Sequence, residues 1–326
     1  MAGERQNRTV DFHAHAVPDS FRREMAKLGI DPLEEDGFPV PDWNGEDHLA
    51  WMDQAGIDLS VLSISSPHLY SGDDGKAKDA ARAVNDAMAQ VCREHPGRFR
   101  FAASLPLPCV DGALEETARA MDELGAAGVK VATNMGGVYL GDPALDALME
   151  ELDRRKALVI LHPARARERP VNVITGGIAP MFEYPADTTR AVLNLIAHRT
   201  ITRFPGIRFV VPHCGSFLPY MLQRFIGISQ VLSASGRMEP VDARAEFDGL
   251  WFDIAGDAQP AALKSLLLVA SRERLVYGSD YPYTPGAVVL RKKQELEAAE
   301  GPLMGQICGE NACALLPEAG EHAGQG

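Results

Sequence analysis

The sequence predicts an α/β protein built as a (β/α)₈ barrel. Two observations favour this fold class: eight short apolar runs recur along the 326 residues, and amphipathic helical stretches separate most of them. Near-continuous runs of Val, Ile, Leu and Phe are typical of strands that are covered on both faces. Strand–helix alternation indicates a parallel sheet, and eight such units fit a closed barrel better than an open sheet.

Each predicted strand is a run of six or seven residues in which apolar side chains are frequent. Short runs of this kind between helical segments are the usual signal of parallel β/α units. In chain order, the predicted strands are Thr9–His15, Leu59–Ser65, Phe99–Leu105, Gly128–Asn134, Ala157–Pro163, Ile207–His213, Leu250–Ala255 and Arg274–Asp280.

Helical periodicity is clearest in four of the intervening segments. The predicted helices are Ala77–Glu94, Leu114–Gly125, Ala144–Arg155 and Thr188–Arg203. Two connections are long, Ala16–Asp58 and Ala164–Asp187, and both follow predicted strands. Long loops in compact domains usually act as lids or binding loops, and in a barrel these two would lie at the catalytic face, where the strands end.

Length and composition narrow the class of protein. One domain is expected over residues 8–317, with flexible termini at residues 1–7 and 318–326. The formal net charge of -13 disfavours nucleic acid as a partner, because phosphate binding needs a basic surface. The N-terminus lacks the apolar core of a secretory signal, no stretch approaches ~20 apolar residues, and the five cysteines lack CxxC spacing, so we expect a cytoplasmic protein without a membrane span.

Metal-ligand side chains fall at the ends of four predicted strands. His13 and His15 end the first, His162 the fifth, His213 the sixth and Asp280 the eighth. A parallel barrel directs its strand ends at one cavity, and residues two apart on a strand point the same way. Histidine nitrogens together with a carboxylate oxygen suit Zn²⁺ or a similar divalent ion, with a further position open to water or substrate.

Each of these features has another reading when it is taken singly. A His-x-His pair can lie on a surface or in a core, His162 can be a core histidine with a satisfied hydrogen bond, and Asp280 can be a turn or N-cap aspartate. Four strand ends with ligand-type residues in the same phase are difficult to explain by packing. The pattern as a whole therefore predicts a mononuclear metal site of His13, His15, His162 and Asp280.

The motifs DFHAH, ILHP, VVPHCGSFLPY and YGSDYP resemble the second amidohydrolase family. That group contains aminocarboxymuconate-semialdehyde decarboxylase and the resorcylate and methylsalicylate decarboxylases. The resemblance covers about residues 9–316, and the segments SVLSISSP, HPGRFRFAASLPLP and EYPADTTRAV are most similar to the methylsalicylate decarboxylases. It implies an amidohydrolase-like barrel, the four metal ligands above, and a homodimer or larger homo-oligomer.

The resemblance also assigns roles to further residues. His213 matches a histidine that acts in proton transfer beside the metal, and Arg224 matches an arginine that reaches the neighbouring subunit's site to hold a substrate carboxylate. His48 lies near positions where relatives carry carboxylate-binding arginines. Relatives often have HGGG or HAGG where this chain has HCGS, so the shape of the substrate pocket is expected to differ.

Several other side chains are weighed from the residues themselves. Arg190 could bind a carboxylate or form a surface ion pair, and Phe182 could stack on an aromatic ring or pack within the loop. A nucleophilic Cys214–His213 pair is disfavoured, because strand neighbours point to opposite faces. No lysine ends the fourth strand, where Lys130 comes early, so a carbamylated-lysine dinuclear centre is not expected.

The predicted function is non-oxidative decarboxylation of a hydroxylated aromatic acid or a related unsaturated carboxylic acid. His213 or Asp280 would deliver the proton, and one divalent ion per chain, zinc or alternatively manganese, would hold the small-molecule acid. Hydrolysis of a lactone or amide is the alternative, since the same ligands can activate water. A binding barrel without catalysis is disfavoured because no ligand is missing.

Overall fold

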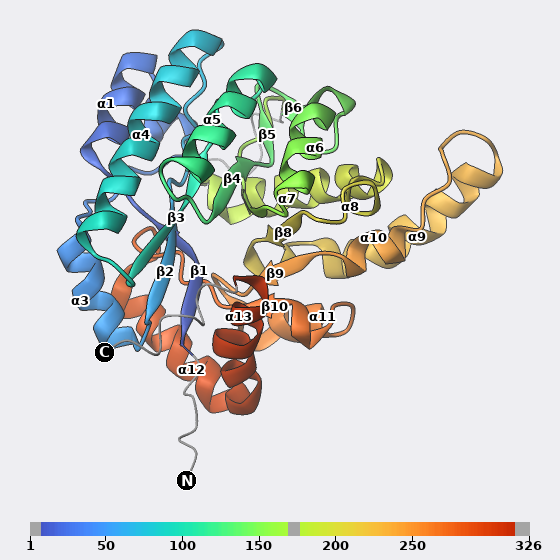
Figure 1. Ribbon diagram of the computed structural model, residues 1–326. Coiled ribbons are helices and arrows are strands. Elements are labelled where there is room, and N and C mark those ends of the chain that lie inside the picture. The colour runs from blue at the N-terminus through green and yellow to red at the C-terminus, as the bar shows by residue number, and fades with distance from the viewer. Residues whose placement is uncertain (1–7, 169–176, 317–326) are drawn as a thin grey trace.

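The computed structural model describes residues 8–168 and 177–316, and its eight main strands form one parallel barrel (Figure 1). The strand order is β1-β2-β3-β4-β7-β8-β9-β10, and every neighbouring pair is parallel. Bridges from Asp11 to Tyr277 and from Ala14 to Tyr281 join the first strand to the last. The predicted (β/α)₈ fold class is therefore confirmed.

All eight barrel strands lie within the predicted runs, and each is shorter than its run. They are β1 (Val10–His15), β2 (Leu59–Ser63), β3 (Phe99–Ser104), β4 (Gly128–Ala132), β7 (Leu158–His162), β8 (Arg208–Val211), β9 (Trp251–Asp253) and β10 (Leu275–Val276). A short hairpin that the sequence did not predict, β5 (Asn134–Met135) with β6 (Val138–Tyr139), follows β4.

The four predicted helical segments are all helical. The helices are α1 (Asp19–Leu28), α2 (Pro32–Glu35), α3 (Gly45–Ala55), α4 (Asp74–Glu94), α5 (Val110–Asp122), α6 (Asp146–Arg154), α7 (Ala179–Ala197), α8 (Thr200–Arg203), α9 (Leu218–Ala234), α10 (Ala243–Asp248), α11 (Leu263–Leu267), α12 (Gly286–Gly305) and α13 (Asn311–Leu315). The first long connection therefore contains three helices, and the last part of the second, from Ala179 to Asp187, belongs to α7. The termini predicted to be flexible lie outside the described residues.

Two apolar groups build the core. The smaller group joins alternate strand residues, such as Leu59 with Val61 and Leu158 with Ile160, to Leu315 of α13. Only the interior of a closed sheet brings side chains from so many strands together, so this group fills the barrel and α13 covers its end. The larger group packs the outer strand faces against the surrounding helices.

One helix projects from the surface of the molecule. Figure 1 shows α9 and the loop after it extending away from the barrel. Within residues 8–168 and 177–316, none of the helices has the combined length and apolarity that crossing a bilayer requires.

Candidate metal centre and active-site pocket

Three buried histidines meet at the end of the barrel where the strands finish. His13 and His15 come from β1 and His162 ends β7, and one side-chain nitrogen from each lies within 4.8 Å of the others. The register of β1 against β2 shifts between Asp11 and Ala14, and such a bulge re-aims the side chains beside it. Asp11 Oδ1 holds this bend by accepting hydrogen bonds from the backbone N–H groups of His13 and Ser279.

Asp280 and His213 complete the cluster from loops rather than from strands. The prediction that they end the eighth and sixth strands is wrong, since β10 stops at Val276 and β8 at Val211. Both residues have left-handed backbone, with φ of 61° for Asp280 and 58° for His213, which is uncommon for residues other than glycine. Such local strain is concentrated at functional sites.

The left-handed turns place the side chains of Asp280 and His213 beside the two histidines of β1. Asp280 Oδ1 lies 3.2 Å from His15 Nε2 and 3.7 Å from His13 Nε2. The His213 ring centroid lies 5.0 Å from that of His13. The structure therefore brings together all five residues that the sequence assigned to the site chemistry.

A surrounding layer of polar groups orients the histidines. Asp253, at the end of β9, accepts a hydrogen bond from His13 Nδ1 at 2.8 Å and another from the backbone N–H of His213 at 2.9 Å. Ser63 Oγ lies 3.2 Å from His15 Nδ1, and Ser65 Oγ lies 3.1 Å from His162 Nε2. The sequence reasoning missed Asp253, although a carboxylate at the end of the seventh predicted strand was the signal for it.

The electrostatics of the cluster favour proton-free donor atoms at His15, His162 and Asp280, whereas His13 tends to keep its proton. Burial opposes charge on His13, but the carboxylates of Asp253 and Asp280 raise its pKa to about 9. Burial lowers the pKa of His15 to about 4 and that of His162 well below its ordinary value. Burial opposes ionisation of Asp280, yet the adjacent His15 and His13 hold its pKa below the usual range.

This donor set fits a divalent cation. The Nε2 atoms of His13 and His15 are buried and, within the part of the chain that the structure describes, lack a well-oriented hydrogen bond, although both lie near Asp280 Oδ1. Buried polar atoms usually have a hydrogen-bond partner or a ligand. Two such nitrogen atoms without one, beside a carboxylate, therefore indicate that a further group binds between them. Imidazole nitrogens with one carboxylate oxygen are ligands that Zn²⁺ and Mn²⁺ both accept.

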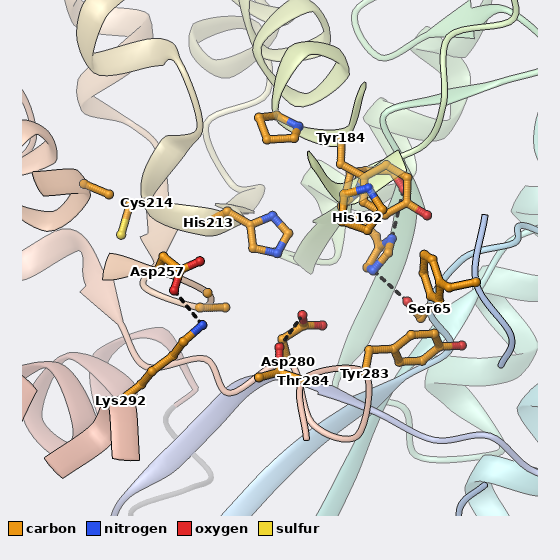
Figure 2. Close-up of a pocket in the computed structure, with 17 residues that line it drawn as sticks. Ser65, His162, Tyr184, His213, Cys214, Asp257, Asp280, Tyr283, Thr284 and Lys292 are labelled. Carbon is orange, nitrogen blue, oxygen red and sulfur yellow. Dashed lines mark hydrogen bonds and ion pairs between the residues drawn. The ribbon is translucent and has the colours of Figure 1, made fainter. Parts of the chain in front are cut away.

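A cavity of about 300 Å³ opens directly above the cluster (Figure 2). His162, His213 and Asp280 form one wall. The rest of the lining is largely apolar and aromatic, and Asp257 and Lys292 lie together on the side away from Tyr184 and Tyr283 (Figure 2). The aromatic lining residues are Phe38, Tyr184 and Tyr283.

The four predicted substrate-binding residues lie outside the lining of this cavity. His48 is buried among aromatic rings, accepts a hydrogen bond from Trp43 Nε1 at 2.8 Å, and its ring lies 4.7 Å from that of Tyr281. Arg190 is held by Asp187 at 2.6 Å, the ion pair that was its alternative reading. Phe182, in α7, packs against Phe217 at the start of α9, an aromatic contact outside the predicted loop, and Arg224 is exposed on α9.

Two further expectations depended on strand geometry. His213 and Cys214 both line the cavity, because they lie in the turn after β8 and not on alternating faces of a strand. The geometric reason for discounting Cys214 was therefore wrong, although burial raises the pKa of its thiol and so disfavours a thiolate. Lys130 is buried, with Nζ 2.9 Å from His68 Nδ1.

Comparison with known proteins agrees with this architecture. A family model described as Amidohydrolase matches residues 10–317. Over 300 residues the chain is 30% identical to 6-methylsalicylic acid decarboxylase of Penicillium expansum, an alignment that covers 90% of this chain and 90% of that one. The resemblance found in the motifs is confirmed.

Solved structures show the same barrel. A crystal structure described as amidohydrolase II superimposes with a TM-score of 0.89 at 32% identity, covering 95% of this chain and 99% of that chain. The structure of 5-carboxyvanillate decarboxylase from Novosphingobium aromaticivorans, complexed with manganese and a nitrobenzoic acid, superimposes with a TM-score of 0.83 at 22% identity, covering 97% and 98% of the two chains. From the match over residues 10–317 and the geometry above, the chain belongs to the amidohydrolase family.

Proposed function

We propose that this protein is a metal-dependent, non-oxidative decarboxylase of a hydroxylated aromatic acid, with one catalytic domain over residues 8–317. The observation that carries the proposal is the group of His13, His15, His162 and Asp280 at the base of a cavity of about 300 Å³. That volume is at the small end of ligand pockets and suits a single substituted ring. The similarity to a methylsalicylate decarboxylase supports this substrate class.

The four clustered side chains would hold one divalent ion. Zinc is the expected ion from the donor set, and manganese is the alternative, since it is bound in the structurally similar 5-carboxyvanillate decarboxylase. When bound, the ion would supply positive charge that fixes an oxygen anion of the substrate. Asp253 keeps the His13 ring in the orientation that leaves Nε2 toward the site.

The protein's own residues would manage the proton. Decarboxylation requires a proton at the ring carbon that carries the carboxylate, after which the carbon–carbon bond breaks, CO₂ leaves and the electron pair of that bond restores the aromatic ring. His213 or Asp280, which both line the cavity, would deliver the proton by general acid catalysis. Burial and the nearby His13 lower the pKa of His213, so its ring must take up a proton before it can donate one.

The proposed reaction is tested by incubating metal-loaded protein with a panel of hydroxybenzoates and measuring CO₂ release. About one divalent ion per chain is expected, and a His13→Ala/His15→Ala variant should lose both the ion and the activity. His213→Ala should keep the ion and lose turnover, whereas the remote His198→Gln should behave as the wild type. Turnover of lactones or amides without CO₂ release would establish the hydrolase alternative instead.

We also propose that the chain forms a homodimer through the projecting helix α9. Exposed apolar side chains on α9, Tyr220 at 87%, Ile228 at 50% and Val231 at 64% exposure, support this proposal. Several exposed apolar side chains on one projecting helix favour association. The role predicted for Arg224, which lies on the same helix, is to enter the partner's site.

A further inference from the structure

One pair of charged residues in the cavity has no part in the chemistry described above. Lys292 of α12 and Asp257 of the loop after β9 both line the cavity, and Lys292 Nζ lies 2.8 Å from Asp257 Oδ1 (Figure 2). The Lys292 side chain is 22% exposed, whereas that of Asp257 is 87% exposed. The Lys292 side chain is thus largely enclosed by the protein, whereas the Asp257 side chain is exposed to solvent.

The cavity otherwise lacks a cationic side chain for an anionic substrate. Among the described residues that line it, Lys292 is the one lysine or arginine. The chain carries a formal net charge of -13, and the cavity also holds the carboxylates of Asp280 and Asp257. An organic acid that enters this field needs a local positive charge beyond the ion-binding cluster.

Breaking the ion pair between Lys292 and Asp257 should cost little free energy. Ion pairs with a solvent-exposed carboxylate contribute ~0–1 kcal/mol because water competes for both charges. A carboxylate bound inside the cavity would meet Lys292 where less water competes, which strengthens a charge-assisted hydrogen bond. Lys292 and His213 both line the cavity, so the two residues face the same space.

We infer that Lys292 binds the carboxylate of the aromatic acid, and that Asp257 is the competing partner that it releases on binding. The inference rests on the proposed function for its substrate class, and it makes Lys292 a residue that determines specificity for acids over neutral aromatic compounds. The carboxylate loses its charge as CO₂ forms, so Lys292 would hold the substrate more strongly than the transition state. Its loss should therefore raise KM and should not lower kcat.

The test compares two substitutions that break the same ion pair. Lys292→Met should raise KM for the hydroxybenzoate that is turned over by about 10- to 100-fold, with kcat within about threefold, as expected for a lost hydrogen bond to a charged group. Asp257→Asn should lower KM, because it frees the lysine. A purely structural pair would give both variants the same direction of change, which would overturn the inference.

A matched control is available one residue further along α12. Lys293 forms an ion pair with Glu297 and does not line the cavity, so Lys293→Met changes the net charge of the same helix equally. It should leave KM unchanged. A rise in KM for Lys293→Met as large as that for Lys292→Met would assign the effect to the general field and contradict a specific contact.

Calorimetry with manganese-loaded protein separates binding from turnover. Lys292→Met should weaken salicylate binding by about 10- to 100-fold and leave the neutral isostere salicylamide unaffected. Lys292-dependent salicylate binding without CO₂ release from any hydroxybenzoate would support this inference and refute the proposed reaction. CO₂ release with equal KM and equal salicylate affinity in wild type and variant would refute the inference, and so would a wild-type protein that binds no aromatic acid.

Discussion

At the scale of single residues, Asp253 connects the parts of the site. Its Oδ2 accepts from His13 Nδ1, and its Oδ1 accepts from the backbone N–H groups of His213 and Ala255. One buried carboxylate therefore fixes the ring of a proposed ligand and the turn that carries the proposed proton donor. The neighbouring positive charge of His13 keeps the pKa of Asp253 lowered in spite of burial.

Replacing Asp253 should weaken the ion site without removing a ligand. For Asp253→Asn we expect metal affinity to fall about 10- to 100-fold, as is typical when the hydrogen-bond partner of a ligating histidine is lost. Competition with a chelator measures this affinity. Asp248→Asn, which breaks an exposed ion pair with Arg244, is the control, and equal affinities of the two variants would contradict the role given to Asp253.

Lys130 should make stability depend on pH. Burial lowers its pKa to about 7, whereas a lysine in the unfolded chain keeps its ordinary value of about 10.4. Between these values the unfolded chain binds a proton that the native protein does not, so the free energy of unfolding contributed by Lys130 rises with pH. Below about pH 7 both states are protonated and the slope from this group vanishes.

Urea unfolding of the wild type and of Lys130→Met at pH 7 and pH 9 checks this slope. The wild type should gain about 2 kcal/mol relative to the variant across that interval, since one proton changes stability by ~1.4 kcal/mol per pH unit. The exposed Lys264→Met should run parallel to the wild type. A difference between wild type and Lys130→Met that stays constant with pH would mean that Lys130 is charged in the native protein.

At the scale of elements, helix α7 forms part of the cavity wall and is tied down by one buried carboxylate. Asp187 accepts hydrogen bonds from Thr133, Asn134, Tyr139 and Arg190. These bonds join the β5–β6 hairpin to the helix that carries Tyr184 and Pro180 into the cavity lining. The orientation of α7, and with it the cavity shape, therefore depends on Asp187.

The two members of the Asp187–Arg190 ion pair should differ in their contributions to stability. Asp187→Ala leaves several buried donors without an acceptor and should cost about 3 kcal/mol. Arg190→Met should cost no more than ~1 kcal/mol, because the arginine side chain is half exposed. Chemical denaturation provides both values, and equal losses would show that the pair acts only through its charge interaction.

At the scale of the whole molecule, association through α9 should be separable from folding. Val231→Asp on the exposed apolar face should convert a dimer to a monomer, because a buried unpaired carboxylate opposes association. Light scattering during gel filtration measures the mass. Leu268→Asp, at an apolar side chain that is 86% exposed on another surface, should leave the mass unchanged, and a wild type that is monomeric at all concentrations would exclude the proposed dimer.

The barrel and most of the site could be predicted because they follow from local patterns. Alternating apolar runs and helices specify the β/α order, and the ligand residues lie at or just beyond the strand ends. The exact ends of β8 and β10 could not be predicted, because His213 and Asp280 adopt left-handed backbone that depends on distant contacts. The N–H of His213 donates to Asp253, and the N–H of Asp280 donates to the carbonyl of His13. Lys292 was missed because its place in the cavity depends on how α12 packs against the loop after β9.

The closure of the barrel has a consequence for biosynthesis. His13 and His15 leave the ribosome first, but the backbone N–H of His15 bonds to Tyr281, and the N–H of Asp280 bonds to His13, only once the last strand has emerged. During synthesis, two of the three proposed histidine ligands are therefore made at the start of the chain, and the carboxylate of Asp280 is made last. Capture of a cation by the full proposed ligand set would therefore follow translation. A chain truncated before residue 280 would lack the hydrogen bonds between the first strand and the segment after the last one.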